Sequence, residues 1–168
     1  MFIQEVIDTI EAFAPPALQA SYDNSGLMCG DPSQPLSSVL ICLDVTEEVV
    51  GEAIARDANL IISHHPLIFG GLKQITTSTY TERCLIKAIK NDIVIYAAHT
   101  NLDVVFEGVS GRMADKLNLI NRKFLQPEIS PNELYGSGMV GDLPVPQDSM
   151  EFLLRIKEIF HCGAMRYT

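Results

Sequence analysis

Three short, uninterrupted apolar runs constrain the fold more than any other feature of this 168-residue chain. They cover residues 39–43, 60–62 and 93–97, which is the length of a strand rather than a helix. Strands without polar alternation are typical of a sheet that is covered on both faces. Helical patterns over 46–56 and 79–90 separate the runs, and this alternation predicts βαβ units with parallel strands.

The segments outside this alternation are more varied. Apolar residues recur at helical spacing over 2–13, and the sequence Ala14-Pro15-Pro16 ends that helix. Two further helices are predicted, one over 110–118 with Ser110 as its cap and one over 149–160 with Asp148 and Glu151 as a capping pair. The stretches that remain are a predicted loop over 21–38, a polar boundary or crossover over 122–137, and a candidate strand over 138–143.

These patterns predict an α/β fold in which a parallel or mixed sheet is flanked by helices. We expect an α/β domain over 1–120 that carries the chemistry of the protein. Residues 121–168 are expected to form a crossover and the start of a second segment that is cut short, because an open α/β domain would need further strands after the final helix.

Composition excludes several classes of protein. An apolar fraction of 47% argues against disorder, and no stretch approaches the ~20 apolar residues of a membrane helix. A net charge of −9 disfavours non-specific binding to nucleic acid or anionic lipid. Residues 1–5 lack the basic start of a secretory signal, and the four cysteines form no C-x-x-C pair. We therefore expect a cytoplasmic protein with no membrane or nucleic-acid partner.

Histidines and carboxylates gather where the predicted strands end. His64 and His65 follow the second run, His99 and Asp103 follow the third, and Asp44 ends the first. Ligands of open parallel sheets bind outside the carboxyl ends of the strands, so these residues are expected at one edge. Imidazole together with carboxylate suits a divalent ion such as zinc, manganese or iron. Neighbours on an extended chain point to opposite sides, which favours two ions, one for each of His64 and His65.

Structural roles for the same residues stay open at this point. The His64-His65 pair can satisfy backbone carbonyls in a buried loop, and His99 can be a ligand, a partner that orients a ligand, or a local hydrogen-bonding residue. Asp44 is expected to cap the helix that follows it more often than to bind metal. His161, at a helix C-terminus, is interpreted as structural. We interpret Gly70-Gly71 as a turn.

Several segments resemble the Nif-three-like family, whose members are often named GTP cyclohydrolase 1 type 2 homologs. The resemblance extends over about residues 5–120, and its motifs occur in the order found in the family. They are Ala14-Pro15-Pro16, Tyr22-Asp23-Asn24-Ser25-Gly26-Leu27, Leu43-Asp44-Val45-Thr46, Ile62-Ser63-His64-His65-Pro66-Leu67-Ile68-Phe69 and Tyr96-Ala97-Ala98-His99-Thr100-Asn101-Leu102-Asp103.

The resemblance implies a Nif-three-like fold of two similar α/β halves and a site for two divalent metal ions. His64, His65 and Asp103 match metal ligands of the family by motif position, with one histidine for each metal. His99 matches a position that is not itself a ligand, and we assign it to orienting one. The resemblance also implies a homohexameric ring with the metal sites facing inward.

The family's remaining ligands are a histidine and a glutamate four residues later, and this chain has no counterpart for them. His161 is followed four residues on by Met165. The implied function is that of a metal-dependent hydrolase acting on a small molecule, with a GTP-like nucleotide or cyclic amidine as the suggested substrate. The alternative is a non-catalytic oligomeric module that binds partners and uses metal ions as clips.

Overall fold

The computed structural model describes residues 1–129 and 134–167. The chain divides into two compact units, Met1–Leu102 and Asp103–Thr168. The sequence predicts a boundary between residues 120 and 121. That position lies inside the second unit, directly after the first residue of the strand Ile120–Ile129.

The first unit is built on a four-stranded mixed sheet. Its strands are β1 (Gly26–Cys29), β2 (Val39–Cys42), β3 (Leu60–Ser63) and β4 (Val94–Ala97). They are arranged in the order β1-β4-β3-β2, with β2, β3 and β4 parallel and β1 antiparallel to β4. The predicted α/β class and the parallel βαβ units are confirmed.

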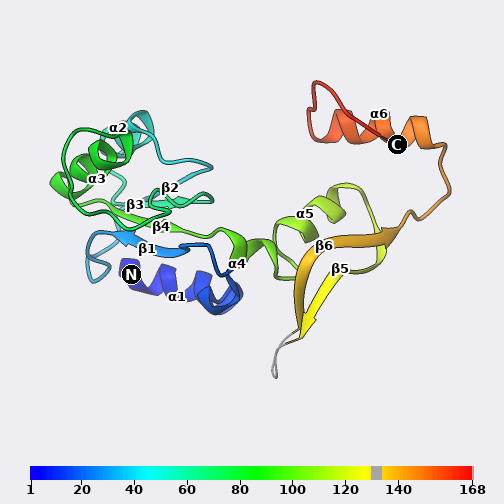
Figure 1. Ribbon diagram of the computed structural model, residues 1–168, viewed down its shortest axis with the longest axis horizontal. Coiled ribbons are helices and arrows are strands. Elements are labelled where there is room, and N and C mark those ends of the chain that lie inside the picture. The colour runs from blue at the N-terminus through cyan, green and yellow to red at the C-terminus, as the bar shows by residue number, and fades with distance from the viewer. Residues whose placement is uncertain (130–133, 168) are drawn as a thin grey trace. The chain divides into compact units, whose positions relative to one another are not determined.

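Helices cover both faces of this sheet, as Figure 1 shows. Helix α1 (Ile3–Phe13), followed by the short 3₁₀ turn η1 (Pro16–Leu18), lies on one face, and α2 (Glu47–Ala55) and α3 (Tyr80–Lys90) lie on the other. Thr46 and Thr79 cap α2 and α3, because each side chain accepts a hydrogen bond from a backbone N–H in the first helical turn.

Consecutive residues of the central strands serve the two layers alternately. Leu60, Val94 and Tyr96 pack with Ile3 and Ile7 of α1 in one cluster. Ile61 and Ile95, which follow Leu60 and Val94 in the sequence, pack instead with residues of α2 and α3. Because both faces are covered, β3 and β4 contain no polar alternation, which is why they were visible as continuous apolar runs.

Two expectations about the sheet were wrong. Strand β2 is an edge strand that is partly exposed, with Ile41 78% exposed, so its apolar run does not mark burial on both faces. The predicted loop over 21–38 contains β1, which pairs with β4 and includes a register shift between Leu27 and Cys29. Gly and Asp, which are uncommon in strands, surround β1, so the local sequence does not indicate a strand. The strand that pairs with it, β4, lies about seventy residues away in the sequence.

The second unit pairs a long hairpin with helices. After α4 (Thr100–Asp103), which begins in the first unit, come α5 (Val109–Lys116), β5 (Ile120–Ile129), β6 (Leu134–Asp142) and α6 (Ser149–Ile159). Most of β5 lies within 122–137, the stretch interpreted as a boundary or crossover, and residues 130–133 of that stretch are outside the described part. The cap of α5 is Gly108 rather than Ser110, whereas Asp148 caps α6 as predicted.

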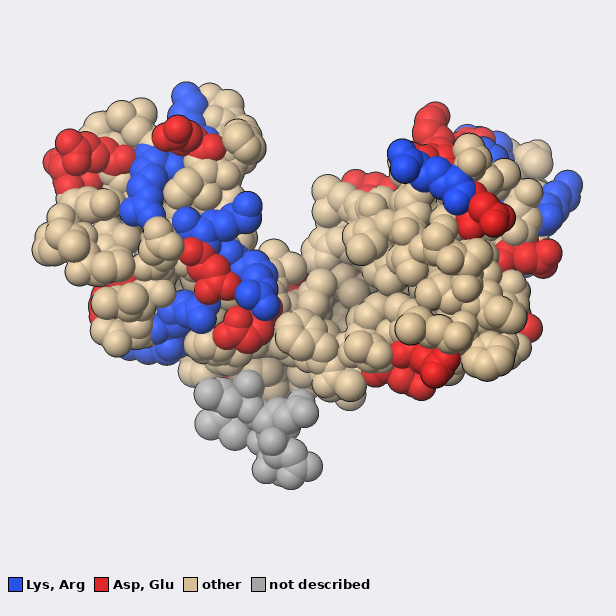
Figure 2. Space-filling view, turned by 180° about the vertical axis from the view of Figure 1, so that it is seen from behind, with Lys and Arg blue, Asp and Glu red and all other residues tan. Residues whose placement is uncertain are grey.

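Opposite charges alternate on the second unit, which lies on the left of Figure 2. The Arg122 guanidinium lies 2.7 Å from an Asp115 oxygen, and that of Arg112 lies 3.1 Å from the other oxygen of the same carboxylate. Arg122 also lies over the Phe106 ring, 5.4 Å from its centroid. Because these pairs are solvated, each contributes little stability, and the Arg122–Asp115 pair joins β5 to the last turn of α5.

Two expectations from composition can be compared with the structure. No helix within the described ranges has both the length and the apolar character that a bilayer crossing requires. The cysteines Cys29, Cys42, Cys84 and Cys162 are free thiols, and Cys84 is buried. Burial and the neighbouring Asp44 carboxylate raise the pKa of the Cys42 thiol to about 11, so it is a poor nucleophile at neutral pH.

Gly30, which follows β1, is a position where only glycine fits. Its φ is +96°, and a Cβ there would lie 2.8 Å from the Val94 Cα. We expect Gly30→Ala to lower the free energy of unfolding by about 2 kcal/mol, because backbone strain and contact with β4 add together. Gly70→Ala, where a Cβ meets nothing within 4 Å, is the control. Equal denaturation midpoints for the two variants would contradict this account.

Candidate metal centre

The parallel strands bring the three site histidines to one edge of the sheet. His64 and His65 follow the last residue of β3, and His99 comes two residues after β4. Backbone hydrogen bonds continue past the strand ends, since the His65 N–H donates to the Leu43 carbonyl over 2.9 Å and the Ala98 N–H to the Ser63 carbonyl over 2.9 Å. The positions of the site backbones are therefore set by the sheet itself.

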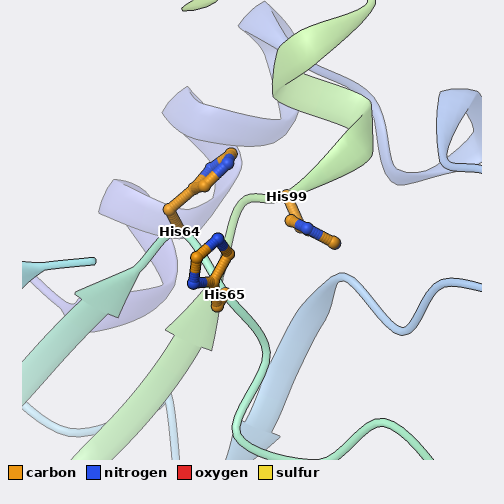
Figure 3. A group of neighbouring side chains, drawn as sticks. All are labelled: His64, His65 and His99. Carbon is orange, nitrogen blue, oxygen red and sulfur yellow. The ribbon is translucent and has the colours of Figure 1, made fainter. Parts of the chain in front are cut away.

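The imidazole rings of His64, His65 and His99 form a compact cluster, shown in Figure 3. Ring centroids are 5.0 Å apart for His64 and His65, 5.1 Å for His64 and His99, and 5.6 Å for His65 and His99. Each ring offers one nitrogen that lies within 4.8 Å of the other two. Nitrogens at this spacing can hold a metal ion, and the prediction that strand-end histidines converge is confirmed.

The expectation that His64 and His65 point to opposite sides was wrong. It assumed an extended chain, but the chain bends at these two residues directly after β3. The buried Ser63 hydroxyl donates to the His65 carbonyl over 2.9 Å, which supports the bend. The two rings are therefore close enough to share one ion, and backbone direction no longer requires a separate ion for each.

Each imidazole is oriented through the same ring atom. The Nδ1 atoms of His64, His65 and His99 lie 2.9 Å from the Ala98 carbonyl, 2.7 Å from Asp44 Oδ1 and 2.8 Å from Asp23 Oδ1. A carbonyl or carboxylate oxygen only accepts, so each Nδ1 carries the proton and the lone pair of the neutral ring is on Nε2. This arrangement, with Nδ1–H held by an oxygen, is the one found in metal-binding histidines, so the donor set fits a borderline divalent cation.

Asp44 holds His65 and does not cap a helix, which corrects the prediction made for it. Thr46 caps α2, while Asp44 lies at the end of the edge strand β2, opposite the bend after β3. The Asp44 side chain is 61% exposed and that of His65 is 42% exposed, so water weakens this pair. Asp44 therefore orients the His65 ring more than it stabilises the fold.

The sequence reasoning assigned no role to Asp23, which lies behind His99. Its side chain is fully buried. Burial by itself would raise the pKa of the carboxyl, but hydrogen bonds from four neighbouring residues hold the pKa well below its usual range. These donors include both the backbone N–H and the hydroxyl of Thr100. The carboxylate is thus charged at neutral pH and fixes the His99 tautomer.

Asn101 supports the same turn from the other side. Its side chain is fully buried, accepts from the His99 backbone N–H over 3.0 Å and donates to the Ala14 carbonyl over 2.7 Å. It therefore ties the start of α4 to the end of α1. The motif residues Asp23, Thr100 and Asn101 all act on the position of His99.

The structure leaves the assignment of Asp103 as a ligand a prediction. Asp103 is the last residue of α4 and begins the second unit, whereas the imidazole cluster belongs to the first. The assignment of His99 to orienting a ligand also stays a prediction. Its ring offers a nitrogen that lies within 4.8 Å of a nitrogen of each of the other two histidines.

A pocket of about 520 Å³ opens beside the cluster. His65 and His99 form part of its lining, together with Asp44, Pro66 and two aromatic side chains, Phe69 and Tyr80. The Phe69 ring meets the His99 ring edge-on, with centroids 5.7 Å apart. A small molecule in this pocket would contact the imidazoles directly.

Known proteins resemble this chain along its whole length. A family model described as Duf34/NIF3 (NGG1p interacting factor 3) matches residues 1–168. The "GTP cyclohydrolase 1 type 2 homolog" of Clostridium acetobutylicum is 34% identical over 165 residues, covering 98% of this chain and 62% of that protein. The protein of the same name from Halalkalibacterium halodurans is 46% identical over 124 residues, covering 74% of this chain and 33% of that protein.

A solved structure shows the same fold. The crystal structure of Staphylococcus aureus hypothetical protein SA1388 matches with a TM-score of 0.87 and 28% identity, covering 99% of this chain and 66% of that one. The chain spans less than two thirds of the length of each of these relatives. On the family match over its full length and the identity to curated relatives, this chain belongs to the Duf34/NIF3 family.

Proposed function

We propose that this chain is the metal-binding part of a metal-dependent hydrolase. The observation that carries the proposal is the convergence of three imidazoles whose Nδ1 atoms are all held by oxygen acceptors. In the proposal His64, His65 and Asp103 bind two divalent ions of zinc, manganese or iron type, and His99 is held beside them by Asp23. When bound, such ions polarise an oxygen of the substrate and activate water near neutral pH.

The chain's own residues have three tasks in this proposal. Asp44 and the Ala98 carbonyl hold the Nδ1 atoms of His65 and His64, which leaves the Nε2 atoms as the ligand atoms of the neutral rings. Asp23 does the same for His99 from a fully buried position. The pocket lined by Phe69 and Tyr80 would hold the substrate against the imidazoles. The name carried by the relatives suggests a GTP-like nucleotide as the substrate.

Metal content per chain tests the first half of the proposal. We expect near-stoichiometric metal in the unmodified chain and none in the His64→Ala/His65→Ala variant, because two of the clustered nitrogens are removed. His161→Asn is the matched control, since His161 lies after α6 with a φ of +52° that asparagine tolerates. Elemental analysis of folded, dialysed protein gives the measurement. Equal metal in the double variant and the control would overturn the assignment of these ligands.

Turnover tests the second half. A panel of nucleotides, phosphoesters and cyclic amidines should contain at least one compound that the metal-loaded protein hydrolyses. His64→Ala should abolish that turnover while the variant still assembles. A metal-loaded protein that hydrolyses nothing in the panel would sink the enzyme proposal.

One observation favours a second candidate, a non-catalytic module in which metal ions clip an oligomer together. Among the residues that the structure describes, Asp44 is the one carboxylate in the pocket lining, and it is already paired with His65, which leaves no second carboxyl group there to act as a general acid. In that case His64→Ala would remove assembly itself rather than turnover. For both candidates we propose a cytoplasmic homo-oligomer, with a hexameric ring as the form to look for by sedimentation.

A further inference from the structure

The residues that line the pocket beside the imidazoles indicate which class of ligand it binds. We infer that it binds a small molecule through a planar, uncharged heteroaromatic ring, and that it provides no side-chain site for a phosphate group. The inference rests on the proposed function, in that it names the class of molecule held at that site. It concerns the chain's own residues and needs no metal.

The first observation is the exposure of two aromatic side chains on the pocket wall. Phe69 is 55% exposed and Tyr80 is 56% exposed, although each could bury its ring in a core. They stand on either side of the 70–79 loop, Phe69 before it and Tyr80 as the first residue of α3. Exposed aromatic rings in a pocket can serve as stacking surfaces for flat ligands, because the π face of any base can pack on them.

The second observation is the charge of the wall. Within the described part of the chain, no Lys or Arg lines the pocket, and the one carboxylate in its lining is Asp44. Two cations of α3 are held elsewhere, because Arg83 pairs with Glu47 at 2.7 Å and Lys87 donates to the Glu47 carbonyl at 2.9 Å. A triphosphate would meet a negative side chain and no positive one. An uncharged ring avoids that repulsion and still fills the pocket.

The 70–79 loop next to the pocket makes contacts of its own and supplies no cation to the pocket lining. The buried Glu82 carboxylate accepts from the backbone N–H groups of Thr76 and Ser78, which ties the end of the 70–79 loop to α3. Lys73 belongs to this loop but is not among the residues that line the pocket. The loop therefore borders the pocket without supplying it with a cation.

Guanosine, GTP and ribose 5-phosphate are suitable probes, with affinities measured by calorimetry on the full 168-residue chain. After EDTA treatment, guanosine should bind at least about tenfold more tightly than GTP, and ribose 5-phosphate should not bind. Phe69→Leu and Tyr80→Leu keep an apolar side chain but remove the ring, so each should weaken guanosine binding about tenfold. Phe13→Leu and Tyr167→Leu, at exposed aromatics outside the pocket lining, should leave it unchanged.

Two results would overturn the inference. One is guanosine binding that is equal in the pocket variants and their controls. The other is GTP binding as tight as guanosine binding. If Lys73→Ala then weakened GTP binding, the phosphate site would lie in the 70–79 loop. This binding experiment can fail independently of the proposed function, because metal content and turnover test the proposed function. Guanosine binding to a chain that retains no metal would support the pocket and refute the metal site.

Discussion

Asp23→Asn should lower the free energy of unfolding by about 3 kcal/mol, because it places an amide N–H₂ among buried donors. One oxygen of Asp23 accepts from His99 Nδ1 and from the Asn24 backbone N–H, and the other accepts from the Thr100 backbone N–H. Whichever way the asparagine turns, its N–H₂ faces a backbone N–H that loses its acceptor. Chemical denaturation followed by circular dichroism measures the loss.

The same variant should weaken metal binding about 10- to 100-fold, because an uncharged amide replaces the carboxylate that holds His99 Nδ1 and fixes the tautomer of the ring. Asp31→Asn is the control. Asp31 accepts from Ser33 in an exposed turn, and its replacement should leave both quantities nearly unchanged. Unaltered metal affinity in Asp23→Asn would show that His99 takes no part in the site.

The stability difference between the parent chain and Asp23→Asn should also depend on pH. The pKa of Asp23 is lower in the folded chain than its ordinary value of 3.8, so the folded state favours the charged carboxylate. The stabilisation is therefore complete above about pH 5 and is lost as the pH falls through 4 and below. A difference that grows on acidification would contradict this account of the carboxylate.

Asn101→Ala should cost about 3 kcal/mol of unfolding free energy, since it leaves one buried and one partly buried backbone group without the side chain that bonds them. These are the His99 N–H and the Ala14 carbonyl, which the Asn101 side chain satisfies from a position with no exposed surface. Loss of these bonds frees the turn after β4 from the end of α1. Metal affinity should therefore fall together with stability, which elemental analysis of the folded fraction would detect.

Asn91→Ala provides the comparison for Asn101→Ala. Asn91 is an exposed asparagine after α3 whose amide donates to the Lys87 carbonyl over 2.8 Å, so water can replace the lost hydrogen bond. Its replacement should change the unfolding free energy by less than about 0.5 kcal/mol. If the two alanine variants unfolded at the same denaturant concentration, the buried bridge made by Asn101 would not be an anchor of the site.

Much of the candidate site was predictable because strand topology dictates it. Continuous apolar runs identified β3 and β4, and residues that follow parallel strands must emerge at the same edge. That geometry alone brings His64, His65 and His99 to one edge of the sheet. The bend after β3 was not predictable in the same way, because it depends on the Ser63 hydroxyl reaching the His65 carbonyl.

The sequence by itself determined the α/β class, most helix boundaries and the gathering of imidazoles, since these depend on local periodicity and on the handed, parallel βαβ connection. Only the tertiary structure decided which oxygen holds each ring. Asp23 lies 76 residues from His99 and Asp44 lies 21 from His65, and no local pattern records such distant pairs. The tertiary structure also placed β1 against β4 and left Phe69 and Tyr80 exposed in a pocket. Strand pairing and burial depend on segments that meet only when the chain folds.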